Sequence, residues 1–318
     1  MNKTGMFSKI KWAVLLIVGL VLFSVILLLM PFSFLRSKEK TIEVNGLARH
    51  YRIHTPKNYS EKAHYPLVIV LHAFKDNPLQ IEIYTGMSNK ADQEGFVVVY
   101  PKGTNSAADH HLSWNSGYCC GVALRQDVDD VNFISSLIDE IKKTYAVDAK
   151  RVYIVGFSNG GMLTYRLGAQ LTHKITAIAV VAASIGGQFE DFPANNIPQP
   201  LQPLSVLALH GQKDDTVLYN GGINKKGDGN FWPVSQSIDF WVKNNKCVGQ
   251  PTEETIKNGV AVKKSYSNCE NNTHVVLYTI PNSGHVWFGG LAEIPKNLLH
   301  QSFSATDTVW DFLKNQSK

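Results

Sequence analysis

The sequence alternates between short runs of consecutive apolar residues and longer segments whose apolar residues recur every three or four positions. A run such as PLVIVL at 66–71 is typical of a strand that is buried on both faces. A segment such as 128–145 places its apolar residues on one face of a helix. Strands and helices that take turns predict an α/β fold with a mostly parallel sheet and helices on both faces. The expected strands are 66–71, 96–100, 151–155, 178–183, 204–209 and 275–280, and the expected helices are 128–145, 161–171, 234–244 and 305–314.

Three other segments extend this pattern. Residues 41–55 are expected to form a hairpin, because two β-rich runs flank the two-residue turn signal Asn45-Gly46. Residues 187–203 and 220–230 are rich in Pro, Asn, Gln or Gly and are expected to be loops at the edge of the sheet where active sites lie. No linker divides residues 41–318, which are expected to form one domain.

The N-terminal segment differs in character from the rest of the chain. No charged residue occurs from Trp12 to Leu35, and about 20 apolar residues in a helix suffice to cross a bilayer. A cleaved signal peptide usually has a shorter apolar region and a small-residue cleavage site, which is not evident before Arg36. Residues 1–40 are therefore expected to be a signal anchor or a signal peptide, and a buried core helix is a third alternative.

The charge of the chain is concentrated in the same segment. Residues 1–40 hold six of the 31 Lys and Arg residues and one of the 26 Asp and Glu residues. The remaining residues therefore have balanced charge, although the formal net charge of the whole chain is +5. Nucleic-acid binding requires a basic surface, so the expected domain is not predicted to bind nucleic acid.

The four cysteines, Cys119, Cys120, Cys247 and Cys269, permit two disulfides in three connectivities if the chain is exported. A Cys247–Cys269 bond would close an excursion between an expected helix and an expected strand. Cys119 and Cys120 could bond to each other or stay reduced, and buried free thiols are the alternative for all four. No paired C-x-x-C or His spacing accompanies them, so a metal site is not expected.

The segment RVYIVGFSNGG at 151–161 carries the strongest chemical signal. It contains Gly156-Phe157-Ser158-Asn159-Gly160, the G-x-S-x-G pattern in which a serine occupies a tight strand-to-helix turn. Small neighbours are needed on both sides of such a turn, and the glycines supply them. Because an apolar strand precedes the pattern and a helix-compatible segment follows it, Ser158 is predicted to be a nucleophile.

A serine nucleophile needs a base, and the base needs an acid that orients it. His285 is the predicted base, because it follows the expected strand 275–280 and has Gly284 beside it. His210 ends an expected strand and is predicted to brace the acid loop instead. Asp214 is preferred as the acid over its neighbour Asp215, and Glu190 and Asp191 are weaker rivals because they lie one strand too early.

An oxyanion hole requires two backbone N–H donors. One is expected from Asn159, the residue after the nucleophile, and the other from Phe74, in the loop after the strand 66–71. Phe74, Trp114 and Trp287 could also form a flat apolar wall for the substrate, or they could be ordinary core residues.

Taken together, the motifs resemble the extracellular poly(3-hydroxybutyrate) depolymerase and feruloyl esterase family of α/β-hydrolases. The resemblance runs from about residue 44 to residue 312 and rests on PLVIVLHAF, YPKG, SWNSGYCCG, DVDDVNFI, RVYIVGFSNGGMLTYRL, LHGQKDDTVLYNGG and SGHVWFGG. It implies the triad Ser158, Asp214 and His285, and it supports a Cys247–Cys269 disulfide. Two positions depart from the family pattern, because Ala73 replaces a glycine and Phe288 replaces a proline.

The resemblance implies a serine esterase that hydrolyses carboxylic esters through an acyl-enzyme, outside the cytoplasm, without a cofactor or metal. Its partner would be a small or oligomeric ester, and only residues 12–35 would contact a membrane. The family does not select among polyhydroxybutyrate-type oligoesters, feruloyl esters and acetyl esters. An acyltransferase or peptidase on the same fold, or a non-catalytic binding protein, are the alternatives.

Overall fold

The computed structural model describes residues 36–107, 110–290 and 303–318. Within them, a ten-stranded sheet has the order β1-β2-β4-β3-β5-β6-β9-β14-β13-β12. The six central strands, from β4 to β14, are parallel to one another. The prediction of a mostly parallel sheet is therefore confirmed. These strands are β3 (Tyr65–Leu71), β4 (Val97–Pro101), β5 (Val147–Phe157), β6 (Ala177–Val181), β9 (Ser205–Gly211) and β14 (Val275–Ile280).

Antiparallel hairpins extend the sheet at both edges. At one edge β1 (Lys38–Val44) and β2 (Leu47–His54) form the expected hairpin, and β2 pairs with β4. At the other edge β12 (Thr252–Ile256) and β13 (Ala261–Tyr266) pair with β14. The sequence did not predict this second hairpin. A disulfide joins Cys247 to Cys269 across its base, as the family resemblance implied. Cys119 and Cys120 are bonded to each other.

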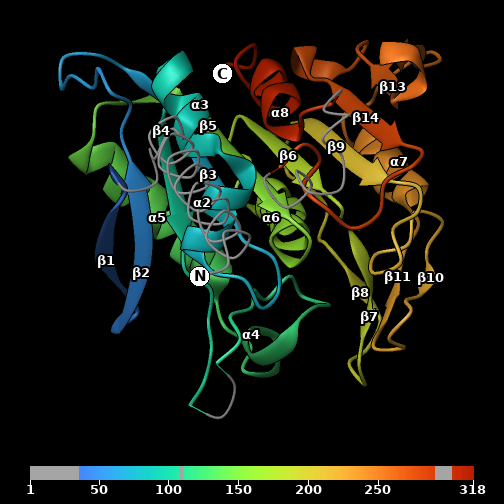
Figure 1. Cartoon of the computed structure of the whole chain (residues 1–318), viewed down its shortest axis with the longest axis horizontal. Coiled ribbons are helices and arrows are strands. Elements are labelled where there is room, and N and C mark those ends of the chain that lie inside the picture. The colour runs from blue at the N-terminus through green and yellow to red at the C-terminus, as the bar shows by residue number, and fades with distance from the viewer. Residues whose placement is uncertain (1–35, 108–109, 291–302) are drawn as a thin grey trace, which may run out of the picture.

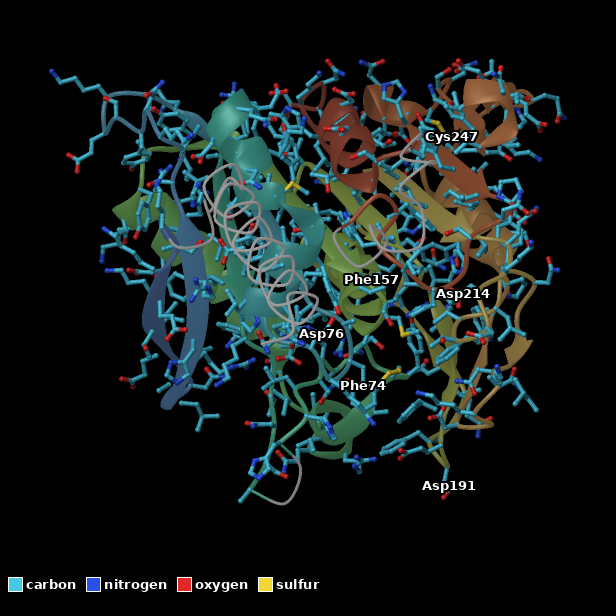
Figure 2. The ribbon with its side chains drawn as sticks, viewed as in Figure 1. Phe74, Asp76, Phe157, Asp191, Asp214 and Cys247 are labelled. Atoms are coloured by element: carbon cyan, nitrogen blue, oxygen red, sulfur yellow. A yellow bond between two sulfur atoms is a disulfide. The ribbon has the colours of Figure 1, made fainter. Side chains whose placement is uncertain are left out.

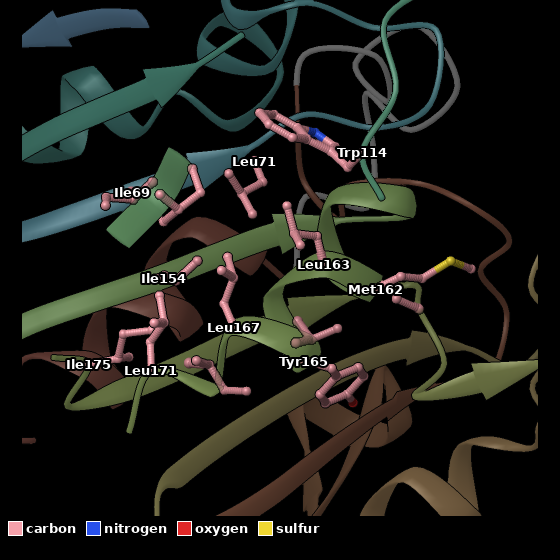
Figure 3. Packing of buried hydrophobic residues seen from close by; sticks show 14 of the residues in the cluster. Ile69, Leu71, Trp114, Ile154, Met162, Leu163, Tyr165, Leu167, Leu171 and Ile175 are labelled. Atoms are coloured by element: carbon pink, nitrogen blue, oxygen red, sulfur yellow. The ribbon is translucent and has the colours of Figure 1, made fainter. Parts of the chain in front are cut away.

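Helices cover both faces of the sheet (Figure 1). The residues of each central strand alternate between two hydrophobic clusters, as expected when successive side chains point to opposite faces. One cluster holds α5 (Asp130–Thr144), α6 (Asn159–Gln170) and α7 (Val234–Asn244) against the sheet. Figure 3 shows part of it, with Leu163 and Leu167 of α6 beside Ile154. The other cluster holds α2 (Pro78–Thr85), α3 (Met87–Glu94) and α8 (Ala305–Leu313).

The segments 187–203 and 220–230, expected to be loops, instead contribute to a second, four-stranded sheet in the order β10-β11-β7-β8. The prediction of irregular loops is wrong at β7 (Gly186–Phe189), β8 (Asn195–Asn196), β10 (Gly222–Ile223) and β11 (Gly229–Phe231). These strands are two to four residues long, too short for a two-residue periodicity to be visible. They form because two distant segments pair, which local sequence does not reveal.

Two shorter helices, α2 and α3, were also not predicted, nor was α4 (Gly121–Arg125).

The apolar segment 12–35 lies outside the described residues. In the part of the chain that the structure describes, every helix is too short or too polar to cross a membrane.

Candidate active site

Three parallel strands of the central sheet end at the same edge, and the three residues predicted to act together follow them. Ser158 follows β5, Asp214 follows β9 and His285 follows β14. Because β5, β6, β9 and β14 are parallel neighbours, their carboxyl ends meet at the same edge. Ligands in open α/β sheets bind outside this edge. The sheet order therefore brings together residues that are far apart in the sequence.

Ser158 adopts the strained backbone conformation of a sharp strand-to-helix turn, with φ 55° and ψ −121°. Gly156 and Gly160 permit this turn for a steric reason. A Cβ atom on Gly156 would lie 2.2 Å from the carbonyl oxygen of Gly160, and one on Gly160 would lie 2.4 Å from that of Leu71. Larger residues would therefore displace the turn or the strand beside it. The predicted role of both glycines in making room for Ser158 agrees with these distances.

His285 bridges the serine and the carboxylate. Its Nδ1 lies 2.8 Å from Asp214 Oδ2, and its Nε2 lies 2.9 Å from Ser158 Oγ. A carboxylate only accepts hydrogen bonds, so Nδ1 carries the proton and Nε2 is free to accept one from the serine hydroxyl. The imidazole stacks on the ring of Phe157, with 5.2 Å between ring centroids, which restricts its rotation. This is the geometry that a serine nucleophile and its base require.

The Asp214 carboxylate is buried and fully partnered. Its Oδ1 accepts hydrogen bonds from the backbone N–H groups of Thr216 and Val217, at 2.9 and 2.8 Å. Burial by itself would raise the pKa of Asp214, but hydrogen bonds from His210 and His285 outweigh it and hold the pKa well below its ordinary value. Asp214 therefore stays ionised at neutral pH and can orient His285 and stabilise its protonated form.

The structure also places the alternatives to Asp214. Asp215 is exposed and lies 3.6 Å from Lys225. Glu190 forms an ion pair with Arg125. Asp191 lies at the tip of the second sheet, far from Asp214 (Figure 2). None of the three contacts His285 among the described residues.

His210 lies behind the acid, as the sequence predicted. Its Nε2 donates to the carbonyl oxygen of Val217 at 2.7 Å and lies 3.3 Å from Asp214 Oδ2. The shorter bond goes to the backbone, so His210 chiefly holds the loop that carries Asp214. Its side chain is 2% exposed.

The two predicted oxyanion donors border the same site. Asn159 is the first residue of α6, and Phe74 lies in the loop after β3. Neither backbone N–H donates a hydrogen bond to another group among the described residues. The side chain of Asn159 is fixed by two hydrogen bonds with the backbone of Trp114, at 2.8 and 3.0 Å. Both N–H groups are therefore available to an oxygen of a ligand.

His72 organises the strand end that carries Phe74. Burial lowers the pKa of His72 to about 4, so the ring is neutral at pH 7. Its Nε2 accepts from the backbone N–H of Gly103 at 3.0 Å, and therefore its Nδ1–H donates to the carbonyl oxygen of Ala73 at 2.8 Å. These bonds hold Ala73 beside the predicted oxyanion site.

A cavity of about 360 Å³ opens at Ser158 and His285. Trp287 and Phe74, both predicted to form an apolar wall for the substrate, line this cavity. The full lining comprises Ala73, Phe74, Lys75, Asp76, Tyr84, Phe157, Ser158, Thr216, Lys226, His285, Val286, Trp287 and Gly290.

Trp114 does not belong to this wall. Its side chain is 0% exposed, and its ring lies in the core cluster near Leu71 and Leu163 (Figure 3). Its indole N–H donates to the carbonyl oxygen of His72 at 3.0 Å. Trp114 therefore supports the strand end below the cavity, and the predicted substrate contact is corrected to a core position. The alternative stated for it, an ordinary core residue, describes it correctly.

Several lining residues were not singled out from the sequence, among them Asp76, Tyr84, Phe157 and Lys226. Phe157 and Asp76 lie within two residues of positions that were, so proximity to Ser158 and Phe74 could have suggested them. Tyr84 and Lys226 come from α2 and from the turn between β10 and β11, elements that the sequence did not predict. No group of His, Cys, Asp or Glu side chains in the described part of the chain could hold a metal ion.

Comparison with known proteins agrees with this architecture. The sequence profile of the family described as "Esterase PHB depolymerase" matches residues 50–192. Feruloyl esterase B of Piromyces equi is 30% identical over 233 residues, which cover 72% of this chain and 41% of that protein. A bifunctional acetylxylan esterase/xylanase of Neocallimastix patriciarum is 27% identical over 248 residues, which cover 76% of this chain and 31% of that protein. The chain thus spans less than half the length of these two relatives.

A solved structure of acetyl xylan esterase from Aspergillus awamori has a TM-score of 0.59 at 12% identity and covers 87% of this chain and 99% of that one. At this identity the likeness concerns the fold, and it supports the α/β-hydrolase arrangement of the sheet and helices. The profile match also includes the turn that carries Ser158. Across residues 50–192, the chain is therefore similar to the esterase PHB depolymerase family, and feruloyl esterases are among its homologues.

Proposed function

We propose that the protein is a serine esterase with Ser158 as nucleophile, His285 as general base and Asp214 as the orienting acid. The observation that carries the proposal is the continuous pair of hydrogen bonds, 2.8 Å from Asp214 to His285 and 2.9 Å from His285 to Ser158. The family of residues 50–192 and the names of the relatives support ester hydrolysis in particular.

In the first half of the reaction, His285 Nε2 accepts the hydroxyl proton while Ser158 Oγ attacks the ester carbonyl carbon. The backbone N–H groups of Phe74 and Asn159 donate to the oxyanion that forms. His285 then returns its proton to the alkoxide leaving group, and an acyl-enzyme remains on Ser158. In the second half, His285 accepts a proton from water, which attacks the acyl carbon, and the proton then passes to Ser158 as the acid is released.

The substrate is proposed to be a feruloyl or acetyl ester, the classes that the names of the relatives print. Polyhydroxybutyrate-type oligoesters are a further member of the proposed range, because the matched family carries that name. The aromatic rings of Phe74, Phe157 and Trp287 on the cavity wall suit an acyl group with a flat apolar part.

The protein is proposed to act outside the cytoplasm, with residues 41–318 as the catalytic domain and residues 1–40 as the segment that exports or anchors it. Two disulfides, Cys119–Cys120 and Cys247–Cys269, support this location, because such bonds persist in oxidising compartments.

The test is hydrolysis of p-nitrophenyl acetate by the purified protein and by Ser158→Ala. Removal of a serine nucleophile typically lowers kcat by about a million-fold, so activity should fall to the level of the remaining oxyanion stabilisation. Circular dichroism should show the same folded spectrum for both proteins. Turnover that survives in the folded variant would exclude Ser158 as the nucleophile.

A further inference from the structure

The segment SWNSGYCCG at 113–121 is part of the family resemblance, but the proposed mechanism does not use it. Residues 112–120, here called the connecting segment, join β4 to α4 without forming a helix or a sheet strand. Buried backbone groups in such an irregular segment must find hydrogen-bond partners elsewhere. Several of these partners lie on the two stretches that carry the proposed oxyanion donors, Phe74 and Asn159.

On one side, Trp114 and Asn159 are joined by a reciprocal pair of hydrogen bonds. The Trp114 backbone N–H donates to Asn159 Oδ1 at 2.8 Å, and Asn159 Nδ2 donates to the Trp114 carbonyl oxygen at 3.0 Å. The same carbonyl oxygen accepts a hydrogen bond from the backbone N–H of Cys120 at 3.1 Å. Asn159 is buried, so both ends of its side-chain amide are used within the protein and hold the first residue of α6 in place.

On the other side, two hydrogen bonds with the connecting segment flank Phe74. The Trp114 indole N–H donates to the carbonyl oxygen of His72 at 3.0 Å, two residues before Phe74. The backbone N–H of Lys75, directly after Phe74, donates to the carbonyl oxygen of Leu112 at 2.9 Å. The loop after β3 is thus fixed both before and after the residue whose N–H is proposed to bind the oxyanion.

The ring of Phe74 also packs against the end of the connecting segment. A Cβ atom on Gly121 would lie 2.6 Å from Phe74 Cε2 and 3.2 Å from the side chain of Ser113. Gly121 has a φ of 59°, a conformation that favours glycine. A larger residue at position 121 would therefore shift Phe74 or strain the backbone, and the glycine permits the close contact.

Trp114 contacts both stretches at once, because its backbone bonds to Asn159 and its indole bonds to His72. Its side chain is 0% exposed, and its ring lies 4.8 Å from that of His72 between centroids, so it has little freedom to move. The spacing of the two donors matters for catalysis, since both N–H groups must lie about 2.7–3.1 Å from the position that the oxyanion will occupy.

We propose that Trp114 and the side chain of Asn159 are positioning residues that set the spacing of the two oxyanion donors. This inference rests on the proposed esterase function. Neither side chain lines the cavity, so both act through the backbone N–H groups of Phe74 and Asn159. Loss of a whole donor costs about 100- to 1,000-fold in kcat, and we expect about 10- to 100-fold where a donor is displaced but still present.

Two variants test the two sides separately. Trp114→Phe keeps an aromatic ring in the core but removes the N–H that bonds to His72. Asn159→Ala removes both bonds to Trp114 and keeps its own backbone N–H. Each should lower kcat/KM for p-nitrophenyl acetate by the factor above, chiefly through kcat and with KM within about threefold of wild type, because the donors act in the transition state.

Trp241→Phe is the matched control. Trp241 is also a core tryptophan with 0% exposure, but its indole N–H has no hydrogen-bond partner among the described residues. This variant removes the same part of a buried side chain and should keep wild-type kcat. A loss of kcat in Trp241→Phe as large as that in Trp114→Phe would show that core damage is sufficient and would overturn the proposal.

A thionoester separates the position of the donors from other defects. p-Nitrophenyl thionoacetate has sulfur in place of the carbonyl oxygen, and sulfur is a weak hydrogen-bond acceptor. Displaced donors should therefore cost the oxygen ester more, so the ratio of kcat/KM for the oxygen ester to that for the thionoester should fall by about tenfold in both variants. Equal losses on both substrates would indicate damage to the triad or the fold and would overturn the proposal.

Failure of the proposed function would look different. If the wild-type protein hydrolyses none of these esters, or if folded Ser158→Ala retains turnover, the esterase assignment fails. If the wild type acts through Ser158 but Trp114→Phe and Asn159→Ala keep wild-type kcat, only the positioning role fails. Should Trp114→Phe not fold, as judged by circular dichroism, Asn159→Ala and Asn159→Ser provide the same comparison from the other side of the connecting segment.

Discussion

Two carboxylates near the cavity differ in their surroundings: Asp214 is buried behind His285, whereas Asp76 is partly buried and lines the cavity. At the catalytic strand ends, Asp214 receives hydrogen bonds from two backbone amides and from His285, with His210 close behind. In the loop after β3, the Asp76 carboxylate receives no hydrogen bond from the described residues. The pKa of Asp214 is accordingly held below its ordinary value, and that of Asp76 is raised to about 6.

This difference in hydrogen-bond partners indicates a different role for each carboxylate. A carboxylate that is fully partnered within the protein is rigid and permanently ionised, so it can orient a histidine through every step of a reaction. A carboxylate without internal partners keeps its accepting capacity for a ligand, but the folded state is less stable for it. Three substitutions would break or sharpen this contrast.

Asp214→Asn should have the largest effect. The substitution keeps the shape of the side chain but removes the charge that orients His285, and a comparable change in a Ser-His-Asp triad lowers kcat by about 10⁴-fold. The measurement is kcat for p-nitrophenyl acetate. Asp215→Asn, next to it in the sequence but exposed and paired with Lys225, should keep wild-type kcat. If Asp215→Asn is the impaired variant, the assignment of the acid is wrong.

His210→Phe should have an intermediate effect. The variant leaves the carbonyl oxygen of Val217 without its 2.7 Å partner, while the 2.8 Å bond between His285 and Asp214 remains. Loss of one buried hydrogen bond corresponds to about 1–3 kcal/mol. We therefore expect a lower midpoint in urea unfolding and a fall in kcat of about tenfold. A loss as large as that of Asp214→Asn would instead make His210 a partner in the catalysis itself.

Asp76→Asn should have the smallest effect. Unlike His210→Phe, which should lower the stability of the folded protein, it should raise that stability at pH 8. A carboxyl pKa that is higher in the folded state than in the unfolded chain means that Asp76 favours folding while it is protonated. This contribution is present at low pH and is lost as the pH rises through about 6. The neutral asparagine should therefore raise Tm at pH 8, by about 2 °C for a chain of this size, and leave it nearly unchanged at pH 4.

The check is thermal unfolding at both pH values, with Asp191→Asn as an exposed control. A Tm that falls at pH 8 would show that Asp76 has stabilising partners in the folded protein, contrary to the contrast drawn above. For Asp214 the pH dependence of stability should be the reverse. Its pKa is lower in the folded state, so its ionised form stabilises the fold at neutral pH, and this stability is lost only under acidic conditions.

Much of the architecture could be predicted from the sequence. The central strands are apolar on both faces and the larger helices are amphipathic, so 66–71, 234–244 and 275–280 matched β3, α7 and β14 closely. The G-x-S-x-G turn singled out Ser158, and loops after later strands singled out Asp214 and His285, which the structure brings within hydrogen-bond distance. The second sheet, the β12–β13 hairpin and the helices α2 and α3 lacked such signals.

The sequence alone determined the features that depend on near neighbours in the chain: the period of apolar residues, the small residues around Ser158 and the turn at Asn45-Gly46. Only the tertiary structure decided that Trp114 lies in the core while Trp287 faces the cavity, and that Asp214 is partnered while Asp76 is not. Burial and hydrogen-bond partners come from segments that are distant in the sequence. No local pattern records them, and they set the chemistry of the site.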